Sequence, residues 1–166
     1  YGFFGLVVIV PIMRNLFGGN GKSVLTASIL LGIMILPTLI SVGESAIRAV
    51  PESYYEGALA LGATPEETVF KVMLPAAKSG LTAGVILAID RSIGEAMAVS
   101  MVAGNQPIIP GSLLSGVRTL TANIVLEMGY AADMHREALL ATGVVLFIFI
   151  LLINLSFSLL RKGEDK

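Results

Sequence analysis

The sequence predicts an all-α integral membrane protein, a helical bundle of about four spans. Of its 166 residues, 55% are hydrophobic and only 14% are charged. The mean hydropathy of +0.84 is far above that of a water-soluble domain. Three apolar stretches also reach the ~20 residues that a helix needs to cross a hydrocarbon core ~30 Å thick. These observations exclude a soluble globular domain.

The predicted spans lie at about 1–13, 24–43, 81–103 and 138–160. The first, YGFFGLVVIVPIM, is short, and neither a basic segment nor a small-residue cleavage site precedes it, so we expect no signal peptide. We expect a truncated first span and a polypeptide that continues upstream. Residues 1–166 are therefore predicted to be one transmembrane domain, the C-terminal part of a longer chain, with loops at 14–23, 44–80 and 104–136.

Charge and residue counts exclude several function classes. Lys and Arg number 11 against 12 Asp and Glu, which gives a net charge of -1 and no basic footprint for nucleic acid. The chain has no Cys, which excludes disulfides, thiolate nucleophiles and Cys-bound zinc, and its single His135 cannot supply a His-rich metal site. We therefore expect no metal site, no catalytic residue, no bound cofactor and no nucleic-acid partner.

The distribution of basic residues predicts the orientation in the membrane, because Lys and Arg favour the cytoplasmic side. If the tail 161–166 is cytoplasmic, so is the loop 44–80, and the loop 104–136 is on the outer side. The cytoplasmic side then holds six basic residues: Arg48, Lys71, Lys78, Arg161, Lys162 and Lys166. The outer side holds four: Arg14, Lys22, Arg118 and Arg136.

The loop 44–80 carries the signals of two short helices outside the bilayer, at roughly 52–61 and 65–77. Each begins at a capping box, and Gly62 is placed to end the first helix. The two boxes are Ser53-x-x-Glu56 and Thr64-Pro65-Glu66-Glu67. Tyr and Leu residues give the first helix an apolar face, which is typical both of docking into a groove of a soluble partner and of lying on a membrane surface.

The same loop resembles the EAA motif (E-A-A-x3-G-x9-I-x-L-P) of permease subunits in ABC importers. The matching residues are Glu56, Gly57, Ala58, Gly62, Val72, Leu74 and Pro75, at the spacing of the motif throughout. Gly57 replaces the middle Ala and Val72 replaces Ile. The resemblance implies a coupling helix that sits in a cleft of a separate ATP-binding cassette subunit, which hydrolyses ATP, and passes the movement of that subunit to the spans.

A second resemblance covers nearly the whole chain. The stretch IGEAMAVSMVAG at 93–104, the run Arg118-Thr119-Leu120-Thr121, and His135 before the last span are similar to the phosphate-specific importer permease of the PstC type. The sister PstA type is similar in plan. This resemblance implies the type I ABC permease fold and location in the cytoplasmic (inner) membrane of a prokaryote. It also implies a second permease subunit, a phosphate-binding protein on the outer side, and contact with membrane lipid.

Three charges inside the predicted span 81–103 require compensation: Asp90, Arg91 and Glu95. Each costs about 2.5 to 3.5 kcal/mol at a helix centre on an insertion scale. Arg91 and Glu95 are four residues apart, share a helical face and are placed to pair. We predict that this face lines the substrate pathway, where Arg91 donates to phosphate and Glu95 holds the guanidinium or accepts a proton. The alternative is an ion pair that ties spans together, and Asp90 would repel an anion unless it is neutralised or turned away.

Other functions share some of these features. Permeases for sulfate, molybdate or phosphonate have the same loop motif, and an ion-coupled secondary carrier would also explain buried charges, although not the motif. Gly21-Lys22-Ser23 ends like a phosphate-binding P-loop, but that pattern needs Gly at position 16, where this chain has Leu16. We therefore predict a simple turn at 18–23.

Overall fold

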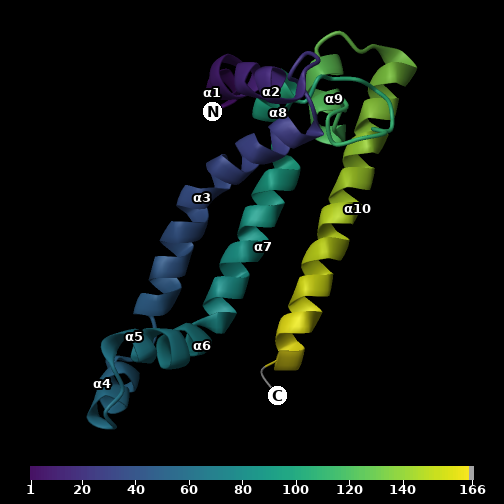
Figure 1. Cartoon of the computed structure of the whole chain (residues 1–166). Helices are drawn as coiled ribbons and strands as arrows, with labels where there is room; N and C mark the ends of the chain where they lie inside the picture. Colours follow the sequence, from purple (N-terminus) through teal and green to yellow (C-terminus); the bar gives the residue numbers. More distant parts are fainter. Residues whose placement is uncertain (165–166) are drawn as a thin grey trace. The chain divides into compact units, whose positions relative to one another are not determined.

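A computed structural model describes residues 1–164, and their side chains through Leu159. Asp165 and Lys166, the end of the predicted cytoplasmic tail, lie outside the described residues. Most of the described residues are helical, and the longest connection, residues 103–119, joins α8 to α9. In order they are α1 (Gly2–Phe4), a π-helical turn η1 (Gly5–Ile9), α2 (Val10–Phe17), α3 (Val24–Arg48), α4 (Glu52–Ala60), α5 (Pro65–Thr68), η2 (Val69–Met73), α6 (Leu74–Ala76), α7 (Lys78–Gly94), α8 (Met97–Val102), α9 (Leu120–Glu127) and α10 (Asp133–Glu164) (Figure 1).

Among the described residues, two helices are long and apolar enough to cross a membrane: Val24–Arg48, and Asp133–Leu159 within α10. Pro65–Ala76 and Lys78–Gly94 together are also long and apolar enough, but the two helices are bent by 67° at the break between them. They form a third span only if they cross the membrane as one bent helix. Gly2–Phe17 is a shorter apolar helix. The predicted helical membrane fold is confirmed, whereas the four spans and their limits stay a prediction.

The chain divides into two compact units. Residues 1–35 with 90–155 form the first, and residues 36–89 with the chain from Ser156 onward form the second. The core of the first unit is apolar and is drawn from the first helical stretch, the start of α3 and α8. Its buried members are Ile9, Val10, Met13, Ala27, Leu30, Ala98, Val99, Val102 and Ala103.

The start of α3 is fixed by neighbours far away in the sequence. The N–H groups of Val24 and Leu25 donate to the carbonyls of Ser115 and Leu113 at 3.0 and 2.9 Å, which satisfies donors that a helix start leaves without partners. The predicted turn at 18–23 is confirmed. Gly18, Gly19 and Gly21 all have φ between 71° and 75°, a conformation that only glycine adopts freely.

In the second unit, α4 packs against α5 and η2 to form a helical hairpin, residues 51–77 (Figure 1). The predicted helices at roughly 52–61 and 65–77 are confirmed within a few residues, the second as three consecutive segments. The capping box at Thr64 is confirmed in both directions: Glu67 N–H donates to Thr64 Oγ1 at 3.3 Å, and Thr64 N–H to Glu67 Oε2 at 3.4 Å.

The predicted capping box from Ser53 to Glu56 is wrong. The helix begins earlier, with Pro51 at its N-cap and no side-chain cap, so Ser53 lies inside the first turn. Pro51 has φ -57° and ψ 136°, and its carbonyl accepts from Tyr54 N–H at 3.1 Å. The ring of proline already fixes the φ that a helix entry needs, and this local constraint takes precedence over the Ser signal.

Candidate functional site

The tip of the hairpin has the geometry that its sequence motif predicts. After α4, Ala63 N–H donates to the Ala58 carbonyl and Gly62 N–H to the Leu59 carbonyl, at 3.2 and 2.9 Å. Gly62 has φ +88°. This is the hydrogen-bond pattern of a Schellman turn, in which the residue with positive φ is usually glycine. The predicted helix end at Gly62 is therefore confirmed. The positive φ of this turn explains why the motif has glycine at this position.

The motif residues divide into an outward and an inward set. Glu56, Gly57, Gly62 and Pro75 are exposed, whereas Ala58, Val72 and Leu74 are partly buried. A Cβ at Gly57 would meet no heavy atom within 4 Å, so the outer face of α4 is open. Leu61, at the turn, is 91% exposed. The hairpin therefore presents a narrow tip with an acidic and an apolar residue, a shape that fits a groove of another protein.

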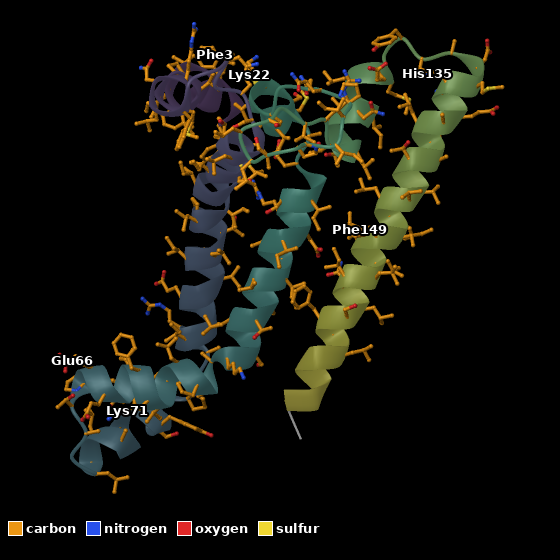
Figure 2. All side chains as sticks on the ribbon, turned by 45° about the vertical axis from the view of Figure 1, so that its right-hand side comes forward. Phe3, Lys22, Glu66, Lys71, His135 and Phe149 are labelled. Carbon is orange, nitrogen blue, oxygen red and sulfur yellow. The ribbon has the colours of Figure 1, made fainter. Side chains whose placement is uncertain are left out.

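An ion pair stiffens the second arm of the hairpin. Lys71 Nζ lies 2.9 Å from Glu67 Oε1, one helical turn away, and Figure 2 labels Lys71 on this arm, together with Glu66. The hydrogen bond from Lys71, then the one from the backbone of Thr64, hold the pKa of the Glu67 carboxyl below its usual value. The pair is solvated, so its effect is to favour the helix start rather than to bind a ligand.

The charged segment 90–95 differs from its prediction. Helix α7 ends at Gly94, so Glu95 lies in the break before α8. Glu95 Oε1 accepts from the N–H of Ala98 at 2.9 Å, while its backbone carbonyl accepts from Thr121 Oγ1 at 3.2 Å. In the part of the chain that the structure describes, no ion pair joins Arg91 to Glu95, and Arg91 is exposed. Their predicted pairing is wrong because it requires a helix that continues through Glu95.

A half-open cavity of about 310 Å³ adjoins this break in the first unit. Its wall is mainly apolar and includes Leu31, Val99 and Phe149, the last labelled on α10 in Figure 2. The polar lining residues are Ser28, Ser92, Glu95, Thr119 and Thr121. Of the two predicted pathway residues, Glu95 therefore lines the cavity and Arg91 does not.

Asp90 precedes Arg91 at the end of α7. One of its carboxylate oxygens, Oδ1, is buried and accepts no hydrogen bond from the described residues. One carboxylate oxygen is thus turned into the protein, and the expectation that Asp90 is neutralised or turned away from the anion stays a prediction.

A polar cluster that the sequence did not predict is centred on Arg118. Its Nη1 lies 2.7 Å from Glu127 Oε1 and 3.3 Å from Asn123 Oδ1, and its Nε donates to the carbonyl of Asn105 at 3.2 Å. The side chains of Arg118 and Glu127 are only 23% and 18% exposed. Arg118 and Glu127 are nine residues apart, outside any helical spacing that would have marked them as a pair.

Two further groups complete the cluster. His135 Nε2 lies 3.4 Å from Glu127 Oε2. A hydrogen bond from Tyr130 is the main cause that holds the pKa of the Glu127 carboxyl below its usual value, with Arg118 and His135 contributing less. The same hydrogen bond raises the pKa of Tyr130. These contacts fasten the loop that carries Arg118 to α9 and to the start of α10.

The chain is similar to known transport proteins along almost its whole length. The family model for the binding-protein-dependent transport system inner membrane component matches residues 3–165. The chain is 42% identical, over 93% of its length, to the probable ABC transporter permease protein YqgH of Bacillus subtilis (strain 168), and covers 52% of that protein. Over its full length it is 36% identical to the phosphate transport system permease protein PstC of Xylella fastidiosa (strain Temecula1) and 32% identical to PstC of Pasteurella multocida (strain Pm70).

The chain covers 58% of each of those two PstC proteins. It thus spans about half the length of the curated relatives it matches. No solved structure matches it.

Proposed function

The chain belongs to the family of binding-protein-dependent transport system inner membrane components, and we propose that it is part of the permease of an ATP-driven importer of inorganic phosphate. The observation that carries the substrate is the similarity along the full chain to proteins named phosphate transport system permease protein PstC. The exposed hairpin tip supports the ATP-driven mechanism, because a secondary carrier has no ATPase subunit with which such a tip would make contact.

In this proposal, the hairpin tip docks into a cleft of a separate ATP-binding cassette subunit. Glu56, Gly57, Ala58 and Gly62 form the contact with that cleft. Val72, Leu74 and Pro75 belong to the second arm of the hairpin, which supports α4. The chain itself binds no cofactor and catalyses no reaction, since ATP is hydrolysed in the partner. A second permease subunit completes the pathway, and a phosphate-binding protein delivers substrate from the outer side. Closure of the ATPase dimer then moves the spans as rigid bodies.

Arg91 and Glu95 belong to the substrate pathway in this proposal, with separate roles. Arg91 is exposed and offers a planar guanidinium whose paired donors match two oxygens of a phosphate. Glu95 lines the neighbouring cavity, while its carboxylate accepts a hydrogen bond from the N–H of Ala98 in the first turn of α8. In this proposal Arg91 is the positive group that the anion meets, and the hydrogen bond from Ala98 N–H to the Glu95 carboxylate supports it, because that carboxylate already has a backbone partner.

The test is uptake of labelled phosphate by cells that carry the full-length permease complex, competed with sulfate and with molybdate. Arg91→Ala should abolish phosphate-selective uptake with assembly unchanged, and Arg91→Lys should restore only part of it, because lysine lacks the paired donors. Arg136→Ala, an exposed arginine at the start of α10, is the matched control and should transport normally. Normal uptake in Arg91→Ala would contradict the pathway role. Equal inhibition by sulfate would contradict the choice of phosphate.

A further inference from the structure

The strongest unexplained feature of the second unit is a close contact between α3 and α7 at the base of the hairpin. An ideal Cβ built on Gly80 would lie 2.7 Å from the Cβ of Ala46. One built on Gly84 would lie 2.8 Å from Val42 Cγ1 and 3.3 Å from its Cβ. Atoms this close overlap, so a side chain at either position would require the helices to move apart or the neighbouring side chain to shift.

The two contacts lie on successive turns of both helices. Gly80 and Gly84 are four residues apart on α7, and Ala46 and Val42 are four residues apart on α3. Residues at this spacing share one face of a helix, so the two contacts form one continuous seam. Glycine in a helix interior is unfavourable relative to alanine. Close packing at the seam explains why both positions are glycine. Gly32 is different, because a Cβ there would meet no heavy atom within 4 Å.

The hairpin is joined to these two helices by short connections. Three residues separate the end of α3 at Arg48 from the start of α4, and a single residue, Ala77, separates α6 from α7. Ala77 is 4% exposed, so this corner is packed. Because both ends of the hairpin are tethered closely, a force on α4 reaches α3 and α7 together if the seam does not slip.

We propose that this seam makes the hairpin and the adjoining parts of α3 and α7 move as one body. Gly80 and Gly84, with Ala46 and Val42, are then positioning residues that transmit the movement of the ATPase to transport. The inference rests on the proposed function, because it assumes that the hairpin is the site of the ATPase contact.

The test uses the full-length permease complex, reconstituted in vesicles with its ATPase subunit, the binding protein and labelled inorganic phosphate. Uptake and ATP hydrolysis are measured in the same vesicles. In Gly80→Ala and in Gly84→Ala, phosphate moved per ATP hydrolysed should fall by about tenfold or more, because overpacking of this kind separates the helices. The matched control Gly32→Ala should keep the wild-type ratio. A merely structural loss would lower uptake and hydrolysis together and leave the ratio unchanged, which would overturn the proposal.

Double variants, in which the neighbour of the new Cβ is made smaller, provide a second test if the single variants do not assemble. Gly80→Ala with Ala46→Gly removes the Cβ that lies 2.7 Å away, and Gly84→Ala with Val42→Ala removes the Cγ1 that lies 2.8 Å away. These pairs should recover most of the wild-type ratio. Failure of both pairs to exceed the single variants would overturn the proposal.

A second readout does not depend on the substrate. Spin labels at Phe70 in the hairpin and Val85 in α7, which are 70% and 46% exposed, report the distance between the two elements. Residues 1–166 have no cysteine of their own, and cysteines elsewhere in the complex are replaced by serine before cysteines for the labels are introduced at these two positions. That distance should stay fixed in the wild type with ATP and without it, and broaden in Gly80→Ala. A distance that changes with ATP in the wild type would overturn the seam. Vesicles that keep it fixed yet import no phosphate would instead contradict the proposed substrate.

Discussion

The hairpin 51–77 and the segment 95–127 are both built from short helices, but different contacts hold them. In the hairpin, the hydrogen bonds that end α4 and begin α5 join residues three to five positions apart, such as Ala63 with Ala58 and Glu67 with Thr64. In the segment, Thr121 Oγ1 donates to the carbonyl of Glu95, 26 positions away, and Arg118 to that of Asn105, 13 positions away. The hairpin is therefore determined locally, whereas the segment depends on contacts that form only in the folded chain.

The largest expected effect breaks the local side of this comparison. Gly62→Val places a β-branched residue at φ +88°, where a side chain costs roughly 1–2 kcal/mol. We expect phosphate uptake to fall about tenfold or more relative to ATP hydrolysis, with membrane insertion intact. Gly62→Asn should lose less than the valine variant, since asparagine tolerates this conformation. Unchanged uptake in the valine variant would show that the turn does not shape the ATPase contact.

The second prediction breaks the non-local side. Arg118→Ala removes the donor to Asn105, Asn123 and Glu127 and leaves a mostly buried carboxylate without its cation. We expect the thermal unfolding midpoint of the full-length permease in detergent to fall by several degrees. Arg136→Ala, an exposed arginine, serves as the control and should not shift the midpoint. Equal midpoints for the two variants would mean that the cluster does not stabilise the segment.

A matched pair of caps sharpens the comparison further. Thr64 caps α5 and Thr119 caps α9, each accepting from the N–H three residues on, at 3.3 and 3.2 Å. Thr64→Ala should destabilise the protein by about 1 kcal/mol, the usual value for an N-cap. Thr119→Ala should cost more, because the Thr119 hydroxyl is also 3.1 Å from Thr121 Oγ1. Chemical denaturation of both variants measures the difference, and a smaller effect at Thr119 would mean that the contact with the Thr121 hydroxyl adds no stability.

The smallest expected effect is on pH dependence. The pKa of Glu67 and that of Glu127 are lowered in the folded chain, by Lys71 and by Tyr130 first of all. Each therefore contributes stability that is present above the usual carboxyl pKa of 4.5 and is lost as pH falls through the lowered value. The pKa of Tyr130 is raised above its usual value of 10.0. Its contribution to stability is therefore present below 10.0 and is lost as pH rises through the raised pKa.

The measurement is the unfolding midpoint as a function of pH. Glu127→Gln should flatten the curve at both ends, since it removes the partner of Tyr130. Glu67→Gln should flatten only the acid end, and by less, because its pair with Lys71 lies in solvent. A basic limb unchanged in Glu127→Gln would contradict the assigned partner of Tyr130.

The site could be predicted where its signals are local. Helix caps, the glycine at positive φ and the spacing of the motif all act within one or two turns, and the structure has them at Thr64 and Gly62. The exception is Ser53, where a neighbouring proline determines the helix start. The pairing of Arg91 with Glu95 could not be predicted, because the break at Glu95 depends on acceptors and donors from α8 and from Thr121.

The sequence by itself determined the membrane character, the helical class, the hairpin and its motif, because hydropathy, period and capping are properties of neighbouring residues. Only the tertiary structure decided that α7 ends at Gly94, that Glu95 lines a cavity while Arg91 does not, and that Arg118 forms an ion pair with Glu127. It also decided which glycines of α7 meet α3. The physical reason is the same in each case. Such contacts join residues that are distant in the chain, and their existence depends on how closely whole helices pack rather than on any pattern along one of them.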